Sequence, residues 1–112
     1  MPVKTRSNAE HYTWGDACDG WRHLALEELS VIEERIPPAR SEVAHFHDRA
    51  RQLFYVLSGR LALETADEVV EIAAGESYEV PPAVVHRAHN PFAADAVFWK
   101  RVCSHRQLSP KL

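Results

Sequence analysis

The sequence contains few of the residues that identify special classes of protein. Its two cysteines, Cys18 and Cys103, lie far apart in 112 residues, so it has neither a disulfide framework nor a Cys-x-x-Cys motif. We expect both to be reduced thiols of a cytoplasmic protein and rank a single disulfide between them second. The N-terminal segment lacks an apolar stretch of signal-peptide type. No window approaches the roughly 18 apolar residues of a membrane span. These absences predict a soluble, cytoplasmic protein that does not enter a membrane.

An excess of basic residues is also missing. The chain has 13 lysines and arginines against 16 aspartates and glutamates, which gives a formal net charge of −3. A nucleic-acid surface needs a concentrated basic stripe, whereas these basic residues are scattered along the chain. We therefore expect no nucleic-acid partner. At this length the chain forms one domain, and it buries only about two-thirds of the surface of its unfolded chain.

Helical periodicity is the third absence. The best helical candidate is LALEELSVIEER, residues 24–35, but β-branched residues within it and the following Pro37-Pro38 favour a strand. Glycines and prolines divide the chain into pieces of strand length. The predicted strands are 21–26, 29–36, 43–47, 52–57, 60–65, 69–73, 77–80, 84–90 and 96–103. Many short strands at near-regular spacing predict an all-β sandwich or barrel.

Side-chain alternation along these strands makes specific predictions. Successive residues of a strand point to opposite faces, so His45 and His47 share a face. Residues 52–57 are apolar on both faces, which indicates a strand covered on both sides. The outward faces of two strands then present Leu53, Tyr55, Leu57, Val97 and Trp99. Because a small monomer rarely exposes so much apolar surface, we predict a homodimer.

Two segments carry the most specific signal. The first reads Ala39-x5-His45-x-His47-x4-Gln52-x6-Gly59, and the second reads Gly75-x5-Pro81-x-Ala83-x2-His86-x3-Asn90. They resemble the two motifs of the cupin superfamily, G-x5-HxH-x3,4-E-x6-G and G-x5-PxG-x2-H-x3-N. The resemblance implies a double-stranded β-helix, or jelly roll. We divide the chain into an N-terminal arm (1–20), a cupin barrel (21–104) and a C-terminal tail (105–112).

The resemblance also implies a metal centre. A divalent transition metal would be held by His45, His47 and His86, with Gln52 at the fourth ligand position of the motif. Manganese, iron, nickel and zinc are all candidates, because imidazoles bind each of them well. His86 shares its strand face with Ala88 and Asn90, which should also point inward. The remaining histidines are expected to be surface or packing residues: His11, His23, His89 and His105.

The sequence departs from the motifs at three positions. Gln52 replaces a glutamate, and a neutral amide would leave the site with a charge of about +2 instead of about +1, which makes a bound ion a stronger Lewis acid. The alternative is that Gln52 marks a metal-free cupin. Ala39 and Ala83 replace glycines, which predicts turns that avoid a glycine-only conformation. In the N-terminal segment, Trp14 and Trp21 could wall a pocket or pack in a core or interface, and Cys18 is expected to be a passive thiol.

Two functions follow from this interpretation. The first is a metal-dependent enzyme that acts on a small organic substrate, of the dioxygenase, isomerase or lyase type. The second is a non-catalytic cupin module that binds a small ligand. An enzyme needs an exchangeable ligand position that faces a pocket, whereas a structural metal site is closed by protein. The sequence names no general base, since Tyr55 lies on the outward face.

Overall fold

The computed structural model describes residues 3–104, and this range consists of β-strands joined by turns and loops. No helix that could cross a membrane occurs among these residues. The strands are β1 (Glu10–Trp14), β2 (Cys18–Ala25), β3 (Leu29–Ile36), β4 (Arg40–Ser41), β5 (Ala50–Ser58), β6 (Arg60–Thr65), β7 (Val69–Ala73), β8 (Ser77–Val80), β9 (His86–Asn90) and β10 (Ala96–Ser104).

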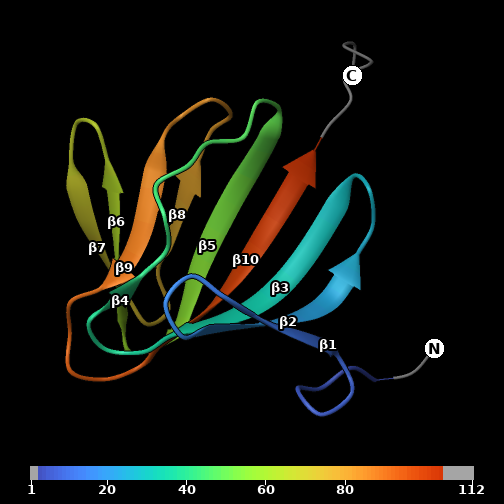
Figure 1. Cartoon of the computed structure of the whole chain (residues 1–112). Coiled ribbons are helices and arrows are strands. Elements are labelled where there is room, and N and C mark those ends of the chain that lie inside the picture. Colours follow the sequence, from blue (N-terminus) through green and yellow to red (C-terminus); the bar gives the residue numbers. More distant parts are fainter. Residues whose placement is uncertain (1–2, 105–112) are drawn as a thin grey trace.

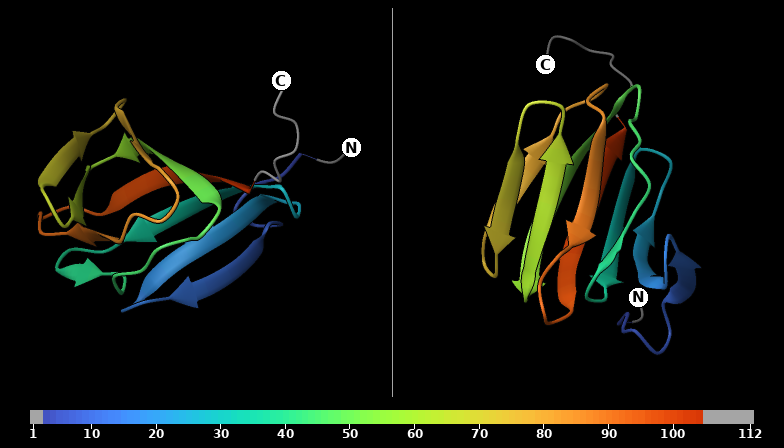
Figure 2. Two further views of the ribbon diagram at one scale, coloured as in Figure 1. Left: turned by 90° about the horizontal axis from the view of Figure 1, so that it is seen from above. Right: turned by 60° about the vertical axis from the view of Figure 1, so that its left-hand side comes forward.

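The strands form two antiparallel sheets that face each other. One sheet has six strands in the order β1-β2-β3-β10-β5-β8, and the other has four in the order β4-β9-β6-β7 (Figure 1). Seen from above, the sheets enclose one interior, and the β1–β2 hairpin extends to one side of it (Figure 2). Strands distant in sequence are neighbours, as in β3-β10-β5. The expected all-β jelly roll is confirmed.

The core follows the predicted alternation of faces. On β5, Gln52, Phe54 and Val56 are buried, whereas the outward Leu53, Tyr55 and Leu57 are 36%, 42% and 42% exposed. The Phe54 ring lies 5.8 Å from that of Phe98 on β10. The rest of the apolar core comes from both sheets, with Ile36, Leu61, Leu63, Ile72, Val80 and Ala88 among its members. The second sheet therefore covers only the inward face of β5.

The segment at residues 43–47 differs from the prediction. It forms no strand, and its pairing is an isolated bridge in which His45 and His86 exchange backbone hydrogen bonds of 3.0 and 2.9 Å. Val43 and Phe46 are 77% and 53% exposed. Because this segment crosses from β4 in one sheet to β5 in the other, its backbone cannot stay paired with either one (Figure 1). The strand predicted for residues 43–47 was wrong.

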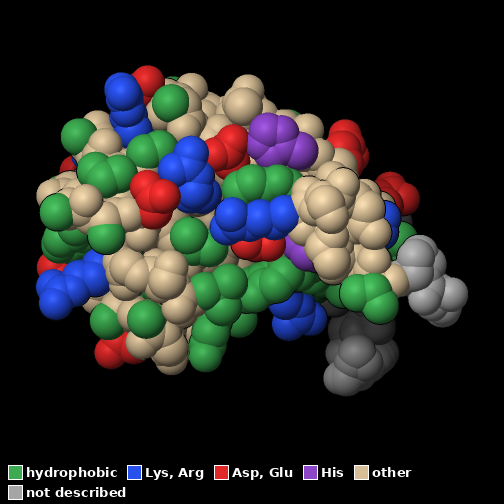
Figure 3. Space-filling view, turned by 90° about the horizontal axis from the view of Figure 1, so that it is seen from below, with side chains coloured by type: hydrophobic (Ala, Val, Ile, Leu, Met, Phe, Trp, Pro, Cys, Tyr) green, Lys and Arg blue, Asp and Glu red, His purple; other side chains and the backbone are tan. Residues whose placement is uncertain are grey.

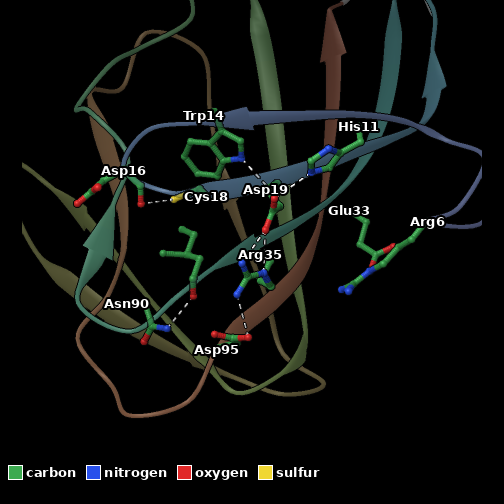
Figure 4. Close-up of polar contacts among 11 residues, drawn as sticks. Arg6, His11, Trp14, Asp16, Cys18, Asp19, Glu33, Arg35, Asn90 and Asp95 are labelled. Atoms are coloured by element: carbon green, nitrogen blue, oxygen red, sulfur yellow. Dashed lines mark hydrogen bonds and ion pairs between the residues drawn. The ribbon is translucent and has the colours of Figure 1, made fainter.

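The N-terminal segment contributes strands to the larger sheet. β1 pairs with β2 and β2 with β3, so residues 10–14 and 18–20 lie within the sheet, while residues 105–112 fall outside the described part of the chain. Arg35 on β3 binds Asp19 on β2 at 2.7 Å and Asp95 at 3.0 Å. The Trp14 indole donates a hydrogen bond of 3.1 Å to the Asp19 carbonyl (Figure 4). The Arg35 contacts attach the hairpin to β3, and the Trp14 bond joins the two strands of the hairpin.

Charged side chains of both signs share the surface. Basic and acidic side chains alternate over short distances on the face shown in Figure 3. Exposed ion pairs such as Arg51–Glu79 (2.6 Å) and Arg60–Glu71 (3.2 Å) fit this pattern. Exposed pairs of this kind contribute only ~0–1 kcal/mol each, so the apolar core dominates the stability of the fold.

The turns at the two motif alanines correct a second prediction. Ala39 and Ala83 have φ angles of 63° and 68°, in the left-handed region that favours glycine. Their backbone N–H groups donate to the carbonyls of Asn90 (2.8 Å) and His47 (2.7 Å), which holds the conformation despite the Cβ. Gly59 is different, because a Cβ there would overlap the Asp95 carbonyl oxygen. The motif positions keep the glycine geometry even where the residue is alanine.

Candidate metal centre

Three imidazoles converge at one end of the barrel interior. The ring centroids of His45 and His86 lie 4.5 Å apart, those of His45 and His47 5.1 Å, and those of His47 and His86 6.2 Å. His86 comes from β9, while His45 and His47 come from the crossing segment between β4 and β5. The isolated backbone bridge between His45 and His86 holds the crossing segment beside β9. Rings this close can present their nitrogens to one ion.

Backbone carbonyls fix the orientation of two of these rings. His45 Nδ1 lies 2.8 Å from the Val43 carbonyl oxygen, and His86 Nδ1 lies 3.0 Å from that of Val84. A neutral imidazole that donates from Nδ1 has its lone pair at Nε2, which is the arrangement that prepares a histidine to bind a metal. His86 Nε2 is buried and has no hydrogen-bond partner among the described residues. An ion is one group that would satisfy it.

Gln52 lies beside His47 and is 1% exposed. Its Nε2 is 3.2 Å from His47 Nε2, and its Oε1 is buried without a hydrogen-bond partner among the described residues. The O and N of an amide are assigned from the surrounding network, so the same side chain can turn its oxygen toward His47. Two ligand atoms each about 2.1 Å from one ion stand ~3.0–3.5 Å apart, a range that includes this separation. The donor set therefore fits a divalent metal.

Burial favours the neutral form of His47 and of His86. The pKa of His47 is lowered from its ordinary value by burial and then by the positive charges near it, those of His45, Lys100 and His86. The pKa of His86 is also lowered, mainly by burial. Unprotonated imidazoles are the form that binds metals, so these shifts extend metal binding to lower pH.

Glu42 is a site residue that sequence reasoning missed. It is 7% exposed, and its Oε2 accepts a hydrogen bond of 2.8 Å from the backbone of Ala88. With His45 and His86 it forms a group whose donor atoms all lie within 4.8 Å of one another. Oε2 lies 4.0 Å from Nδ1 of His45, beyond hydrogen-bond distance, so Glu42 places a carboxylate beside the imidazoles and is itself a candidate ligand. No motif spacing marked this residue.

A cavity of about 370 Å³ opens beside the imidazoles. His45, His47 and Glu42 line one part of it, and the rest is formed by Tyr12, Trp14, Gly15, Glu34, Val43 and Lys100. Its size is at the low end of the range typical of small-molecule sites. Trp14 therefore lines a pocket, which is one of the two roles that the sequence left open for it. The structure thus places the histidines at the edge of a space that a small molecule can enter.

A second polar cluster faces the same cavity and was also missed. Glu34 on β3 is 2% exposed, and its Oε2 accepts a hydrogen bond from the Tyr12 hydroxyl at 3.1 Å. Lys100 on β10 places Nζ 3.1 Å from the same oxygen. Burial raises the pKa of Glu34, and Lys100 opposes that effect. The three residues come from strands far apart in sequence, so no local pattern could have revealed the cluster.

The other singled-out residues lie away from this centre. His11 contacts Asp19 at 2.9 Å, His23 contacts Glu33 at 3.2 Å, His89 is on the other face of β9 from His86, and His105 lies outside the described residues. Cys18 and Cys103 are not bonded to each other. Burial raises the pKa of the Cys18 thiol to about 11, as expected of a passive thiol. Trp21 packs under Arg6, whose guanidinium lies 4.1 Å from its ring centre.

The fold and this histidine cluster define a small jelly-roll protein with a candidate metal site. Residues 32–103 match the sequence model of the cupin domain family, and the chain belongs to this family. A relative in Methanocaldococcus jannaschii, described as an uncharacterized protein, is 26% identical over 61 residues, or 54% of this chain. The match spans about half the length of that relative (49%).

Solved structures support the same fold. A predicted oxalate decarboxylase from Thermotoga maritima superposes with a TM-score of 0.82 at 18% identity, over 93% of this chain and 100% of its own. An RmlC-like cupin from Shewanella frigidimarina gives 0.81 at 20% identity, over 96% and 94%. KdgF from Halomonas sp. gives 0.79 at 16% identity, over 91% and 94%. At these identities the likeness concerns the fold alone.

Proposed function

We propose that this protein is a metal-dependent cupin enzyme that acts on a small organic molecule, with reaction chemistry of the dioxygenase, isomerase or lyase type. The observation that carries the proposal is the buried His86 Nε2, which has no hydrogen-bond partner among the described residues and belongs to a cluster of three imidazoles beside the Gln52 amide. Buried polar atoms almost always have a partner, and a divalent ion would satisfy this one. Manganese, iron, nickel and zinc all suit this donor set.

The proposed ligands are His45, His47, Gln52 and His86, and the Glu42 carboxylate lies beside them. All four ligands are neutral when the imidazoles are unprotonated, so a bound ion would keep most of its charge and supply Lewis acidity toward a substrate oxygen. His45 and His47 line the cavity, which gives a small molecule access to the cluster. This access favours an enzyme site over a closed structural site.

The remaining cavity residues have roles that do not depend on the ion. Trp14 offers an apolar surface to the carbon skeleton of a ligand, and the Lys100 ammonium supplies polar hydrogens to the same cavity. The crossing segment and the β1–β2 hairpin flank the cavity, which is open to solvent. These features support binding of one small molecule against the histidine cluster.

The test is the metal content of the purified protein and of matched variants. We expect about one transition-metal ion per chain in the wild type, and loss of that ion in His47→Ala with the fold retained. His11→Ala is the control, because it also removes a histidine, but one that contacts Asp19 away from the cluster. Unchanged metal content in His47→Ala would refute the site. Metal binding without turnover of any tested substrate would favour the non-catalytic ligand-binding alternative.

We further propose that the protein is a homodimer. The support is the outward face of β5, where Leu53, Tyr55 and Leu57 are at least 36% exposed in a single chain. Burying such side chains contributes roughly 25 cal/mol per Å² of apolar surface. Light scattering at micromolar concentration should give twice the chain mass, and Tyr55→Glu should shift the mass toward that of a monomer. A wild-type protein that scatters as a monomer would contradict this proposal.

A further inference from the structure

The Tyr12–Glu34–Lys100 cluster is a charged group where a structural role would favour apolar side chains. Glu34 and the amino group of Lys100 lie inside the fold, with side-chain exposures of 2% and 14%. Desolvating an ion pair costs several kcal/mol per ion, and well-packed apolar residues at such positions are often as stable or more so. Glu34 Oε1 also has no hydrogen-bond partner among the described residues. The cluster is therefore poorly explained by stability alone.

The position of the cluster relates it to the histidines. Glu34 and Lys100 line the same cavity as His45 and His47. A lysine ammonium has three N–H donors, and within residues 3–104 its ion pair is with Glu34 Oε2. With one N–H of the Lys100 ammonium directed at Glu34, its remaining N–H donors can point into the cavity.

Charge then selects the ligand. With a divalent ion on neutral ligands, the ion and Lys100 together outweigh the two carboxylates that line the cavity, Glu34 and Glu42. The net charge of the loaded site is positive, which favours an anion. Trp14 and Tyr12 also line the cavity, so their rings add carbon surface beside the charged groups.

We propose that Lys100 is a substrate-binding residue, and that the cavity holds a small organic carboxylate between its ammonium group and the histidine cluster. Glu34 and Tyr12 are positioning residues, because they hold Lys100 through Oε2 and do not themselves need to touch the ligand. The inference rests on the proposed function for the identity of the site, and it adds the class of substrate. Opposite-charge recognition of this kind commonly gives both orientation and specificity.

The test compares binding of succinate and succinamide, which have the same shape but differ in charge. Backbone amide shifts in nuclear magnetic resonance titrations give the dissociation constants for zinc-loaded and metal-free protein. We expect wild type to bind succinate, and Lys100→Met to weaken that binding about tenfold, the loss of one charge–charge contact of ~1.4 kcal/mol. Succinamide should bind more weakly than succinate and be little affected by the same change.

Two controls separate a local contact from general effects. Arg101→Met removes one positive charge from the next residue of β10, which is exposed on the outer face, and should change succinate affinity less than twofold. Lys100→Met leaves the Glu34 carboxylate buried without its cation. The double variant Glu34→Gln/Lys100→Met therefore tests the loss of the Lys100 ammonium without leaving a buried, unpaired carboxylate. Tyr12→Phe should weaken binding less than Lys100→Met, as a positioning role requires.

The outcomes distinguish this inference from the proposed function. Three results would each overturn the role of Lys100. The first is equal weakening of succinate binding by Lys100→Met and Arg101→Met, and the second is equal affinity for succinate and succinamide. The third is no succinate binding at 50 mM, ~50 times a 1 mM dissociation constant. Metal content is measured separately for every variant. If metal is retained and the Lys100 effect is absent, the metal site stands without this ligand class. If no metal binds, the proposed function fails, while the wild-type to Lys100→Met ratio in metal-free protein still decides the role of Lys100.

Discussion

Two buried amides in this barrel have opposite surroundings. Asn90 and Gln52 are each 1% exposed and each point into the interior. The Asn90 amide donates 2.8 Å hydrogen bonds to the carbonyls of Ile36 and Ala94, and its oxygen accepts one of 2.9 Å from the backbone of Phe92. Within residues 3–104, the Gln52 side chain has one hydrogen-bond partner, His47, and its oxygen has none. The fold satisfies the first amide completely and the second only in part.

The contrast shows how a structural polar residue differs from one that fits a ligand. Asn90 ties the end of β9 to β3 and to the loop before β10, so its role is complete within the chain. The region around Gln52, His86 and Glu34 has unpartnered buried atoms on three strands. Such atoms destabilise a protein unless a ligand, ion or water satisfies them. The predictions below test this difference, beginning with the largest expected effect.

Replacing Asn90 with Ala should destabilise the protein strongly. The variant loses three hydrogen bonds and leaves buried backbone groups without partners, so we expect the free energy of unfolding to fall by about 3 kcal/mol. Urea denaturation followed by tryptophan fluorescence measures it. The metal content of the folded fraction should not change, because Asn90 is not part of the donor set. A loss of metal with little loss of stability would remove the distinction between the two amides.

Replacing Gln52 with Glu should have opposite effects with and without metal. A buried carboxylate near neutral imidazoles is unfavourable in the metal-free protein, so the free energy of unfolding should fall by about 1–3 kcal/mol. With metal, the carboxylate is the better ligand, and affinity should rise by roughly tenfold, ~1.4 kcal/mol. Chelator competition and urea denaturation measure the two quantities. Any activity that depends on Lewis acidity should weaken, because the added charge raises the pKa of a metal-bound water.

Gln52→Leu is the matched control for that variant. It removes the unpartnered oxygen at similar volume, so the metal-free protein should be as stable as the wild type or more stable. Metal affinity should decrease. If Gln52→Glu and Gln52→Leu had the same metal affinity as the wild type, Gln52 would lie outside the donor set, and the site would consist of the three histidines.

Glu34 should give the stability of the protein a pH dependence. Its pKa is raised in the folded state by burial, so between the unfolded and folded pKa values the folded chain binds more protons at this residue than the unfolded chain. The free energy of unfolding must then decrease as pH rises through that interval. Glu34→Gln should remove this component of the slope. Chemical denaturation of both proteins from pH 4 to 8 checks it, and parallel curves would contradict the assignment.

The smallest effects concern the two motif alanines. Ala39→Gly and Ala83→Gly relieve a left-handed conformation but add backbone freedom to the unfolded chain, so each should stabilise the protein by about 0.5–1 kcal/mol. The Ala39 backbone donates a hydrogen bond to the Asn90 carbonyl, and the Ala83 backbone donates one to the His47 carbonyl. One turn therefore adjoins the Asn90 region and the other adjoins the Gln52 region. Thermal unfolding measures both, and metal content should stay constant. Destabilisation by either glycine would mean that the turn needs the Cβ.

The sequence by itself determined most of the strands, the alternation of faces and three of the histidines. Glycines and prolines mark chain reversals locally, and burial on one face imposes a period of two, so these features are readable from neighbouring residues. That is why Gln52, Phe54 and Val56 were correctly placed inside, and why His86, Ala88 and Asn90 share a face. The motif spacing then located the histidines that the fold brings together.

Only the tertiary structure decided what surrounds those histidines. Glu42 meets the site because the crossing segment packs against β9, and Tyr12, Glu34 and Lys100 meet because β1, β3 and β10 belong to one sheet. The loss of pairing at residues 43–47 and the left-handed turns at Ala39 and Ala83 also depend on distant carbonyls and on the step between sheets. Contacts between residues far apart in the chain follow from strand order, and no local periodicity contains that order.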